Sequence, residues 1–444
     1  MSALVEAVRA ALRASGRRPA VAAHDAWGAS GLELALPETA LLCLQRSGVV
    51  DVLRSRGVDV FCLSEEAGPD AVAGASTLEL LQHEATRAWC AARPPLALLA
   101  FKPTERLQAA AAGLGATLVA GAPAAARAAE NKLAFVDLAQ AAGVPTPRWE
   151  VVPREAVDLE RLGGEWGLPL VVQGPRGNAG QRTWPVRDGR DLERLLALEP
   201  APRLRVAEWV EGMPFTATAL SAPGAAGAAI PPCRQVTSVT WLTPEPLGSC
   251  GNAWGEPRLR AVEADVARQV AALADELARR GYEGVFGVDF VLGPGGPVVI
   301  EVNPRMVASL PVATQLEVLA GRPPLLLHAL AAGLGLVAPP AAQGEPMPDG
   351  SQLIVHELAR RPGPAPGLAS GVYRLDPAGP RRARDGAWLT DLQAGDEALL
   401  VTRSPGEAVS PGREFARVYL RSAAAENTPG VRALVDALRA ADAA

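Results

Sequence analysis

Sulfur ligands are scarce in this sequence. Its 444 residues include only five cysteines, none of them in a C-x-x-C spacing or in a cluster with histidine. An odd number of widely spaced cysteines in a long chain favours neither a disulfide framework nor a zinc site. Neither is therefore expected to hold the fold together. The five residues are Cys43, Cys62, Cys90, Cys233 and Cys250.

A long uninterrupted hydrophobic run is also missing. The longest apolar stretch, residues 324–340, contains His328 and is bounded by prolines, and it is shorter than the ~20 residues that cross a bilayer as a helix. Residues 1–18 carry Glu6 within their apolar part, which is typical of an amphipathic helix rather than of a signal peptide. We therefore expect a cytoplasmic protein without a membrane partner.

No block of basic residues appears along the chain. The 43 basic and 48 acidic residues are intermixed and give a net charge of −5, whereas proteins that follow a phosphate backbone gather positive charge. We therefore do not expect nucleic acid as a partner. With 49% hydrophobic and 20% charged residues the composition is globular, and the length implies about two to four domains.

Lysine is nearly absent. Only Lys102 and Lys132 are lysine among the 43 basic residues, which leaves 41 arginines. A coding bias toward arginine explains this composition, and we favour that explanation for Lys102. Lys132 differs because it follows Glu130 and Asn131 at the start of an expected helix, so we treat it as a candidate binding residue.

The pattern of apolar runs predicts three units and a combination of α/β and α+β structure. In residues 1–125, short runs at 49–53, 58–63 and 96–101 are interpreted as strands that alternate with helical patterns such as 77–91, which predicts an open α/β domain. Residues 126–345 follow as a central domain. Residues 346–444 have short runs between Pro/Gly turns, which predict a β-rich unit ending in a helix at 431–441.

Within the central domain, several segments predict an antiparallel lid at about residues 148–212. A strand at 168–173 leads into a glycine loop, Gly174 to Gly180, and further strands are expected at 183–186, 204–210 and 215–220. Before the lid, a helix at 131–142 is expected to end at Gly143. After it, apolar residues spaced three and four apart predict a long helix at 259–280.

A hairpin at residues 285–304 is the most informative segment. Its strands flank a Gly-Pro-Gly-Gly turn at 293–296, and Asp289 and Glu301 lie at equal distances from residue 295. They should face each other with Cβ atoms about 4.5 to 5.5 Å apart, where like charges are destabilising. We therefore expect positive charge between them.

The same strand face carries a further oxygen ligand. Asn303 lies two residues beyond Glu301 and so on its side of the strand. Two carboxylates and an amide oxygen are hard ligands that suit Mg²⁺ retaining waters and substrate phosphates. The alternative is an exposed hairpin face that happens to be acidic, but the flanking residues are apolar. The glycine loop could close its N–H groups over phosphate oxygens, although by itself it is equally typical of a plain turn.

Taken together, these segments resemble the ATP-grasp family over roughly residues 125–315. The resemblance rests on Glu130-Asn-Lys132, the helix ending Gly-Val-Pro-Thr-Pro147, the glycine lid, Glu208-Trp-Val-Glu-Gly212, and Gly287-Val-Asp-Phe with Ile-Glu301-Val-Asn-Pro-Arg305. The α/β front and the β-rich tail are similar to the arrangement in biotin carboxylase and in carboxylate-amine ligases.

The resemblance implies roles for individual residues. Asp289, Glu301 and Asn303 match the family's ligands for Mg²⁺, with Mn²⁺ as an alternative, and Arg305 together with Asn303 matches its catalytic positions. The residues implied to bind ATP are Lys132, Gln173, Gly177 and Gly180 at the phosphates and Glu208, Val210 and Glu211 at the adenine and ribose.

Two positions depart from the family pattern. Gln173 stands where most members have a second phosphate-binding lysine, and Pro214 stands where many have an acid for the ribose hydroxyls. Arg176 or Arg182 is expected to restore the missing charge. Glu211 or Glu208 is expected to replace the missing acid.

The function implied is that of an ATP-dependent carboxylate-amine ligase, which forms an amide or peptide bond through an acylphosphate and releases ADP and phosphate. Its partners would be a small carboxylate and an amine, free or tethered to a carrier protein, with a homodimer as one assembly. Arg234 and His24 are candidate substrate residues. The alternatives are a bicarbonate-activating enzyme of the biotin carboxylase type and a non-catalytic ATP-binding regulator.

Overall fold

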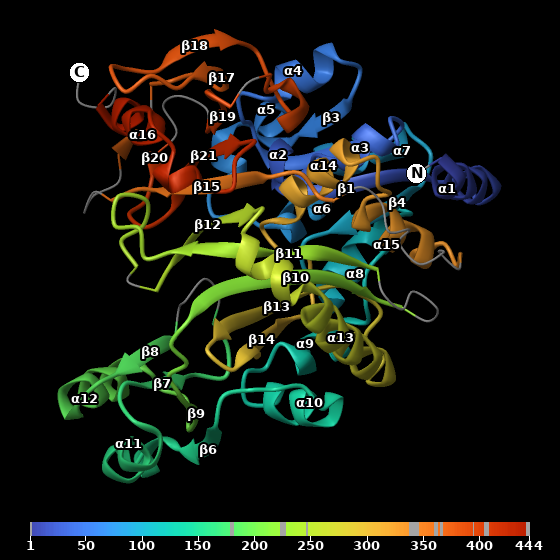
Figure 1. Ribbon diagram of the computed structural model, residues 1–444. Coiled ribbons are helices and arrows are strands. Elements are labelled where there is room, and N and C mark those ends of the chain that lie inside the picture. Colours follow the sequence, from blue (N-terminus) through green and yellow to red (C-terminus); the bar gives the residue numbers. More distant parts are fainter. Residues whose placement is uncertain are drawn as a thin grey trace.

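Parallel and antiparallel sheets organise the protein, whose computed structural model is drawn in Figure 1. The described strands form a five-stranded, a four-stranded, a ten-stranded and a two-stranded sheet. One sheet is parallel and the others are antiparallel, which confirms the expected combination of α/β and α+β structure. The structure describes residues 2–177, 182–222, 228–245, 247–336, 346–358, 363–364, 367–393, 395–403 and 408–440.

The N-terminal sheet is parallel and has the strand order β3-β2-β1-β4-β5. Its strands are continuous apolar runs because both faces are packed, so every residue of β4 (Leu96–Ala100) is buried. The order reverses between β1 (Arg18–Asp25) and β4, and the carboxyl ends of two such strands form the crevice where these sheets bind ligands. The other elements are β2 (Ala40–Gln45), β3 (Asp59–Cys62), β5 (Thr117–Leu118), α1 (Ser2–Ala14), α2 (Ala26–Ala29), α3 (Leu32–Ala35), α4 (Val50–Ser55), α5 (Leu63–Ala67), η1 (Pro69–Val72), α6 (Thr77–Gln82), α7 (Glu84–Ala91) and α8 (Glu105–Gly113).

Two expected elements of this unit differ from the structure. The predicted strand at 49–53 is helix α4, because Val50 and Leu53 are buried three residues apart while Asp51 between them is exposed. The predicted helix at 77–91 is two helices, since His83 has an extended backbone and its Nδ1 accepts a hydrogen bond from Ala85 N at the start of α7.

The lid is an antiparallel sheet, as predicted, with four strands in the order β6-β9-β7-β8. The strand expected at 215–220 belongs to the ten-stranded sheet instead, and residues 149–153 supply a lid strand that was not predicted. Figure 1 shows it at the lower left, away from the N-terminal sheet. Two amphipathic helices, α11 and α12, supply Leu162 and Leu195 to its apolar core. The lid elements are β6 (Trp149–Pro153), η2 (Arg154–Ala156), α11 (Leu159–Trp166), β7 (Leu170–Gln173), β8 (Thr183–Val186), α12 (Gly189–Leu198) and β9 (Arg203–Glu208).

The ten-stranded sheet runs from the central domain into the C-terminal part in the order β14-β13-β10-β11-β12-β15-β21-β19-β17-β18. The boundary expected at residue 345 therefore separates strands of one continuous sheet, because β15 (Gly350–His356) pairs with β12 (Ser249–Trp254). The central elements are α9 (Pro123–Ala129), α10 (Phe135–Ala142), β10 (Met213–Ser221), β11 (Ala229–Thr237), β12 (Ser249–Trp254), α13 (Pro257–Arg279), β13 (Gly284–Gly293), β14 (Gly296–Asn303), α14 (Leu310–Leu319) and α15 (Leu325–Gly333).

The two faces of the central sheet have different neighbours. Helix α13 buries Val266, Val270 and Leu277 against one face, together with α10, which ends at Gly143 in the left-handed conformation as predicted. The opposite face, which includes Leu220 and Val285, packs toward the N-terminal unit. This opposite face also carries the polar residues of the candidate site.

The C-terminal part completes the large sheet and ends in a helix, as predicted. Among the described residues, no helix combines the length and hydropathy that a membrane span requires. The C-terminal elements are β15 (Gly350–His356), β16 (Gly363–Pro364), β17 (Gly371–Arg374), β18 (Arg381–Arg384), η3 (Leu389–Asp391), β19 (Glu397–Thr402), β20 (Ala408–Val409), β21 (Glu414–Leu420), η4 (Ala425–Asn427) and α16 (Val431–Ala440).

Candidate functional site

Asp289 of β13 and Glu301 of β14 are directly paired across the hairpin. The pairing was expected, but the reason given for it was wrong. Gly293 pairs with Gly296, so an uninterrupted ladder would place Asp289 opposite Ile300. A β-bulge at Ile300 adds one residue to β14 and brings Glu301 opposite Asp289.

A cation lies beside this carboxylate pair, as the sequence predicts. Lys132 Nζ is 3.0 Å from Glu301 Oε2, and the lysine is only 4% exposed. Asp289 is held by neutral donors instead, with Gln235 Nε2 at 2.7 Å from Oδ1 and Asn303 Nδ2 at 3.0 Å from Oδ2. Burial, together with the nearby charge of Glu301, raises the pKa of Asp289 to about 6.

Asn303, the last residue of β14, and Arg305, two residues beyond it, join Asp289, Glu301 and Lys132 in one polar cluster. Arg305 Nη2 donates to Asn303 Oδ1 at 3.1 Å, so the asparagine joins Arg305 to Asp289. A cation between the carboxylates would take the amide oxygen, which requires the amide group to turn over. Two carboxylates and one amide fit a hard cation that keeps other oxygen ligands. Among the described residues, no three or more His, Cys, Asp or Glu side chains are grouped so that they could hold a metal ion, so protein carboxylates alone would not complete its coordination.

The lid contacts the cluster through Lys132 and Gln173. Lys132 N donates to Pro175 O in the loop after β7, at 3.0 Å. Gln173 Nε2 donates to Thr183 Oγ1 of β8 at 3.2 Å, and Lys132 Nζ lies 3.5 Å from the same hydroxyl. Gln173 therefore lies beside Lys132 and the carboxylate pair, and its contact with nucleotide phosphates stays a prediction.

Arg205 is the cation that sequence reasoning missed. It pairs with Gln173 across β9 and β7, and its Nη1 donates to Gln173 Oε1 at 3.1 Å and to Ile300 O at 3.0 Å. Burial lowers the pKa of Arg205 to about 10, and the charge of Glu301 opposes that shift, so the guanidinium stays protonated at neutral pH. The signal in the sequence is an arginine between Leu204 and Val206, inside an apolar strand.

The arginines expected to supply this charge lie elsewhere. Arg182 Nε donates to Glu199 Oε2 at 2.6 Å, and Glu199 is buried, so this pair belongs to the lid's own structure. Arg176 is exposed at the loop. Gly177 is partly exposed on the same loop, whereas Gly180 lies outside the described residues.

The expected adenine and ribose residues lie at the end of β9 and just after it. Glu208 accepts hydrogen bonds from Arg148 N at 2.9 Å and from Arg148 Nε at 2.5 Å. Glu211 Oε2 accepts from the indole N–H of Trp209 at 2.9 Å. Val210 packs toward the hairpin turn, where a Cβ on Gly293 would lie 3.1 Å from Val210 Cγ1. Both acids therefore have partners, and their contact with a ribose stays a prediction.

The two expected substrate residues are not brought to the carboxylate pair. Arg234 Nη2 lies 2.6 Å from Glu426 Oε1, and this ion pair joins β11 to the C-terminal part. His24 lies at the end of β1 and lines a separate cavity of about 250 Å³ together with residues of β19 and β21. Their substrate roles stay predictions.

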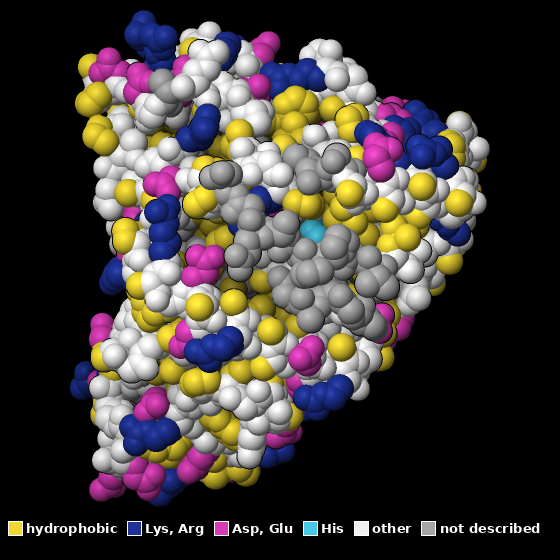
Figure 2. Space-filling view, turned by 45° about the vertical axis from the view of Figure 1, so that its right-hand side comes forward, with side chains coloured by type: hydrophobic (Ala, Val, Ile, Leu, Met, Phe, Trp, Pro, Cys, Tyr) yellow, Lys and Arg dark blue, Asp and Glu magenta, His cyan; other side chains and the backbone are white. Residues whose placement is uncertain are grey.

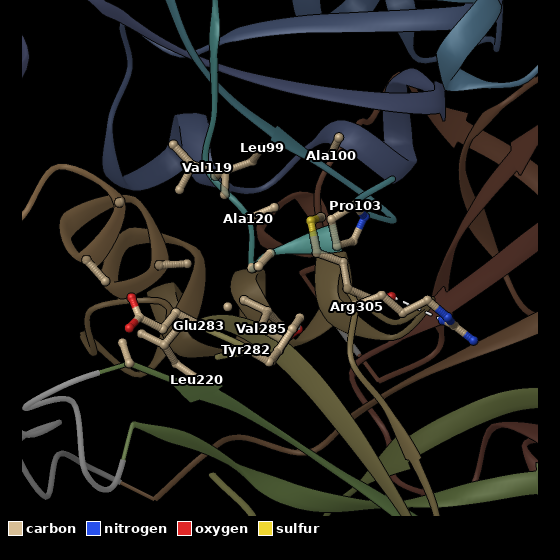
Figure 3. Close-up of a pocket in the computed structure, with 18 of the residues that line it drawn as sticks. Leu99, Ala100, Pro103, Val119, Ala120, Leu220, Tyr282, Glu283, Val285 and Arg305 are labelled. Carbon is tan, nitrogen blue, oxygen red and sulfur yellow. Dashed lines mark hydrogen bonds between the residues drawn. The ribbon is translucent and has the colours of Figure 1, made fainter. Parts of the chain in front are cut away.

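A larger cavity of about 490 Å³ lies beside Arg305, at the ends of β4 and β13 (Figure 3). Its wall is mostly apolar and includes Leu99, Val119 and Leu220. In Figure 3 the guanidinium of Arg305 points away from these residues, so only the stem of this side chain lines the cavity. On the face of the molecule drawn in Figure 2, basic and acidic side chains are intermixed.

Comparison with known protein families matches residues 129–309 to the ATP-grasp domain. These residues include the carboxylate pair, Lys132, the whole lid and Arg305. No curated protein matches the sequence.

Several solved structures share the fold of nearly the whole chain. The biotin carboxylase domain of the Hydrogenobacter thermophilus 2-oxoglutarate carboxylase is 12% identical, with 91% of this chain and 86% of that chain covered and a TM-score of 0.61. N5-carboxyaminoimidazole synthase from Aspergillus clavatus is 15% identical, with 92% and 94% covered and a TM-score of 0.56. Phosphoribosylamine–glycine ligase from Thermotoga maritima is 13% identical, with 96% of each chain covered and a TM-score of 0.57.

At these identities the likeness establishes the fold and leaves the reaction open. The family match and the structural likeness agree with the resemblance found in the sequence. Residues 129–309 are therefore an ATP-grasp domain, and the chain as a whole has the ATP-grasp fold.

Proposed function

We propose that the protein is an ATP-dependent carboxylate-amine ligase, which phosphorylates an acid and transfers the acyl group to an amine with release of ADP and phosphate. One observation carries this proposal: Asp289 and Glu301 face each other, and three cations surround them. These cations are Lys132, Arg205 and Arg305. The cations come from three separate segments. Acidic residues at the centre and cations at the periphery suit a metal-bound polyphosphate.

Each residue has a task that follows from its position. Lys132 and Arg205 bind phosphate oxygens, and Gln173 supplies a neutral donor beside them. Mg²⁺ held by Asp289, Glu301 and Asn303 would neutralise charge on the phosphates. Arg305 faces the acid, as a planar donor suited to carboxylate and phosphate groups. The lid excludes water that would hydrolyse an acylphosphate.

Covalent catalysis by a cysteine is not part of this proposal. Burial raises the pKa of Cys250 to about 11, and it raises the pKa of Cys233 further above its usual value. Both therefore remain neutral thiols at physiological pH, and the thiolate is the nucleophilic form. Transfer to an amine through an acylphosphate needs no side-chain nucleophile.

Nucleotide complexes of proteins with the same fold support ATP and Mg²⁺ as ligands. The Hydrogenobacter thermophilus domain was crystallised as a dimer with MgADP and bicarbonate, and the Aspergillus clavatus enzyme with ADP and 5-aminoimidazole ribonucleotide. These partners favour bicarbonate activation as the second candidate for this chain. We propose that the protein acts in the cytoplasm on small molecules, with an amine acceptor that is free or carrier-bound.

The experiment is an ADP-release screen with Mg-ATP. Pairs of amino acids and small acids are compared with bicarbonate, with and without biotin. Release with an acid and an amine supports the ligase, whereas release with bicarbonate alone supports the second candidate. Binding of ATP without turnover under any condition would identify a regulator instead. Asp289→Asn is the negative control for metal-dependent turnover.

A further inference from the structure

Both lysines of the chain lie at the candidate site. Lys132 is paired with Glu301, and Lys102 Nζ lies 2.8 Å from Oε1 and 2.6 Å from Oε2 of Glu130. Glu130 is only two residues from Lys132. A coding bias toward arginine explains why lysine is scarce, but it does not explain why the two remaining lysines, among 41 arginines, lie at one site.

The fold fixes Lys102 beside Arg305. Lys102 follows the carboxyl end of β4, next to the point where the strand order of the N-terminal sheet reverses. Met306 N donates to Phe101 O at 3.0 Å, which joins the segment after β14 to the segment after β4. The guanidinium of Arg305 lies over the ring of Phe101 at 5.0 Å. Two cations from different domains are thereby held on adjoining backbone segments.

A carboxylate already occupies the space between these cations. Besides its contacts with Lys102, Glu130 Oε1 lies 3.6 Å from Arg305 Nε. Glu130 is the residue that follows α9, at the C-terminal end of this helix. Lys102 is 48% exposed and Arg305 is 14% exposed, so the position can be reached from solvent through the lysine.

The charges leave room for one further anion. Lys102 and Arg305 carry two positive charges, and Glu130 neutralises one of them. The remaining positive charge lies beside Asn303, which links Arg305 to the carboxylate pair of the proposed metal site. An incoming acid bound here would therefore lie close to the phosphates that the site is proposed to hold.

We propose that Lys102 and Arg305 bind the carboxylate of the acid substrate and that Glu130 occupies this position until the acid arrives. The inference rests on the proposed function and adds to it a substrate-binding residue from the N-terminal unit. Lysine suits the task because its compact ammonium can follow a carboxylate oxygen as it moves toward the phosphoryl group, whereas the planar guanidinium demands a fixed geometry.

Kinetics with an acid that supports ADP release provide the first test. Lys102→Gln raises the KM for the acid about ten- to hundredfold, the loss of one charge-assisted hydrogen bond, while the KM for ATP stays unchanged. Lys102→Arg recovers part of the loss. The matched control is Arg127→Gln, which removes the exposed Arg127–Glu105 pair from the neighbouring helix, α9, and leaves both KM values unchanged. An unaltered acid KM in Lys102→Gln overturns the proposal.

The second test works without turnover, so it separates this proposal from the proposed function. An amine-acetylating reagent is applied to the full chain, and mass spectrometry reads the two lysines separately. Exposed Lys102 reacts and buried Lys132 does not. Acetate, glycine and bicarbonate are tested as protecting anions, with inorganic phosphate and Mg-ATP as comparisons, in the wild type and in Glu130→Gln.

We expect at least one carboxylate to protect Lys102, at a lower concentration in Glu130→Gln because the resident carboxylate is gone. Protection by bicarbonate would mean that Lys102 and Arg305 bind bicarbonate, as the second candidate function requires. Protection by phosphate or Mg-ATP but by no carboxylate would overturn the proposal, because Lys102 would then bind the nucleotide. The absence of protection by any anion in both proteins would also overturn it, whatever the ADP-release screen had shown.

Discussion

Arg205 and Gln173 face each other across two lid strands, with Nη1 of the arginine 3.1 Å from Oε1 of the glutamine. The resemblance to the ATP-grasp family implies a phosphate-binding lysine at position 173. This chain has a neutral side chain there, and the buried guanidinium of Arg205 lies beside it on the neighbouring strand. A guanidinium and an ammonium at these two positions would repel each other. Glutamine at 173 is therefore matched to arginine at 205.

The pair can be tested by moving the charge. Gln173→Lys places a second cation beside buried Arg205, so we expect ATP affinity and melting temperature to fall, with a cost of about 1 to 3 kcal/mol for the unpaired buried charge. The double variant Gln173→Lys, Arg205→Gln has a single cation again and should recover most of both losses. Calorimetric ATP titration and thermal unfolding provide the measurements. Equal losses in the single and double variants would mean that the two positions act independently.

The two carboxylates should differ in their effect on stability. Asp289→Asn removes a repelling charge and should raise the melting temperature or leave it unchanged. Glu301→Gln removes the partner of buried Lys132 and should lower it by an amount equivalent to about 1 to 3 kcal/mol. Thermal unfolding in metal-free buffer compares the variants. A stabilised Glu301→Gln would show that repulsion by Asp289 outweighs the lysine pair.

The same two variants test the metal site. Both should lose Mg²⁺-dependent ADP release by roughly two orders of magnitude, since even indirect changes around a bound metal cost about 10- to 100-fold. A titration of initial rate against Mg²⁺ concentration measures the loss. Wild-type turnover in Glu301→Gln would remove Glu301 from the site.

Lys132 should discriminate between ATP and adenosine. Lys132→Gln keeps a hydrogen-bond donor and removes the charge, so ATP binding should weaken about ten- to hundredfold. Adenosine, which has no phosphates, should bind as it does to the wild type. The ratio of the two dissociation constants is the measurement. A similar loss for both ligands would argue for a general structural defect.

Glu317 provides a prediction about pH. This residue of α14 is buried, its Oε2 accepts from Leu325 N at 3.0 Å, and burial raises its pKa to about 8. In the unfolded chain the carboxyl group ionises near the ordinary glutamate pKa of 4.5, so its contribution to stability is full below pH 4.5 and decreases as the pH rises to 8.

Glu317→Gln keeps the acceptor and cannot ionise. It should match the wild type near pH 5 and be more stable at pH 8, with a difference on the order of 1 to 3 kcal/mol. Urea unfolding at both pH values gives the difference directly. A constant difference between the two proteins would show that Glu317 is not the titrating group.

The sequence predicts the central unit well because its signals are local. The hairpin turn, the long helix α13 and the helix end at Gly143 depend on neighbouring residues, and all three are found. The N-terminal unit is harder to predict from sequence, since the short apolar run at Val49 and Val50 fits a strand as well as one helical turn. Continuity of the large sheet through β12 and β15 depends on pairing between strands about 100 residues apart, which no local pattern encodes.

The residues of the candidate site, too, can be predicted only where the local sequence forms a motif. Asp289, Glu301 and Lys132 are recognisable because their neighbours form motifs. Arg205 and Lys102 become recognisable only when strand pairing and domain packing bring them to Gln173 and Glu130. An arginine inside an apolar strand, such as Arg205, indicates a buried charge, but the local sequence does not show which groups that charge contacts.

The bulge at Ile300 has two effects that cannot be separated. The one extra residue sets which side chain faces Asp289, and its carbonyl accepts the hydrogen bond from Arg205 of the lid. The turn at Gly293 to Gly296 can therefore change length without disturbing the site, as long as the paired residues of the two strands keep their register. Loss of the single residue at 300 would reverse the faces of the strand end and release the lid from its anchor at the same time.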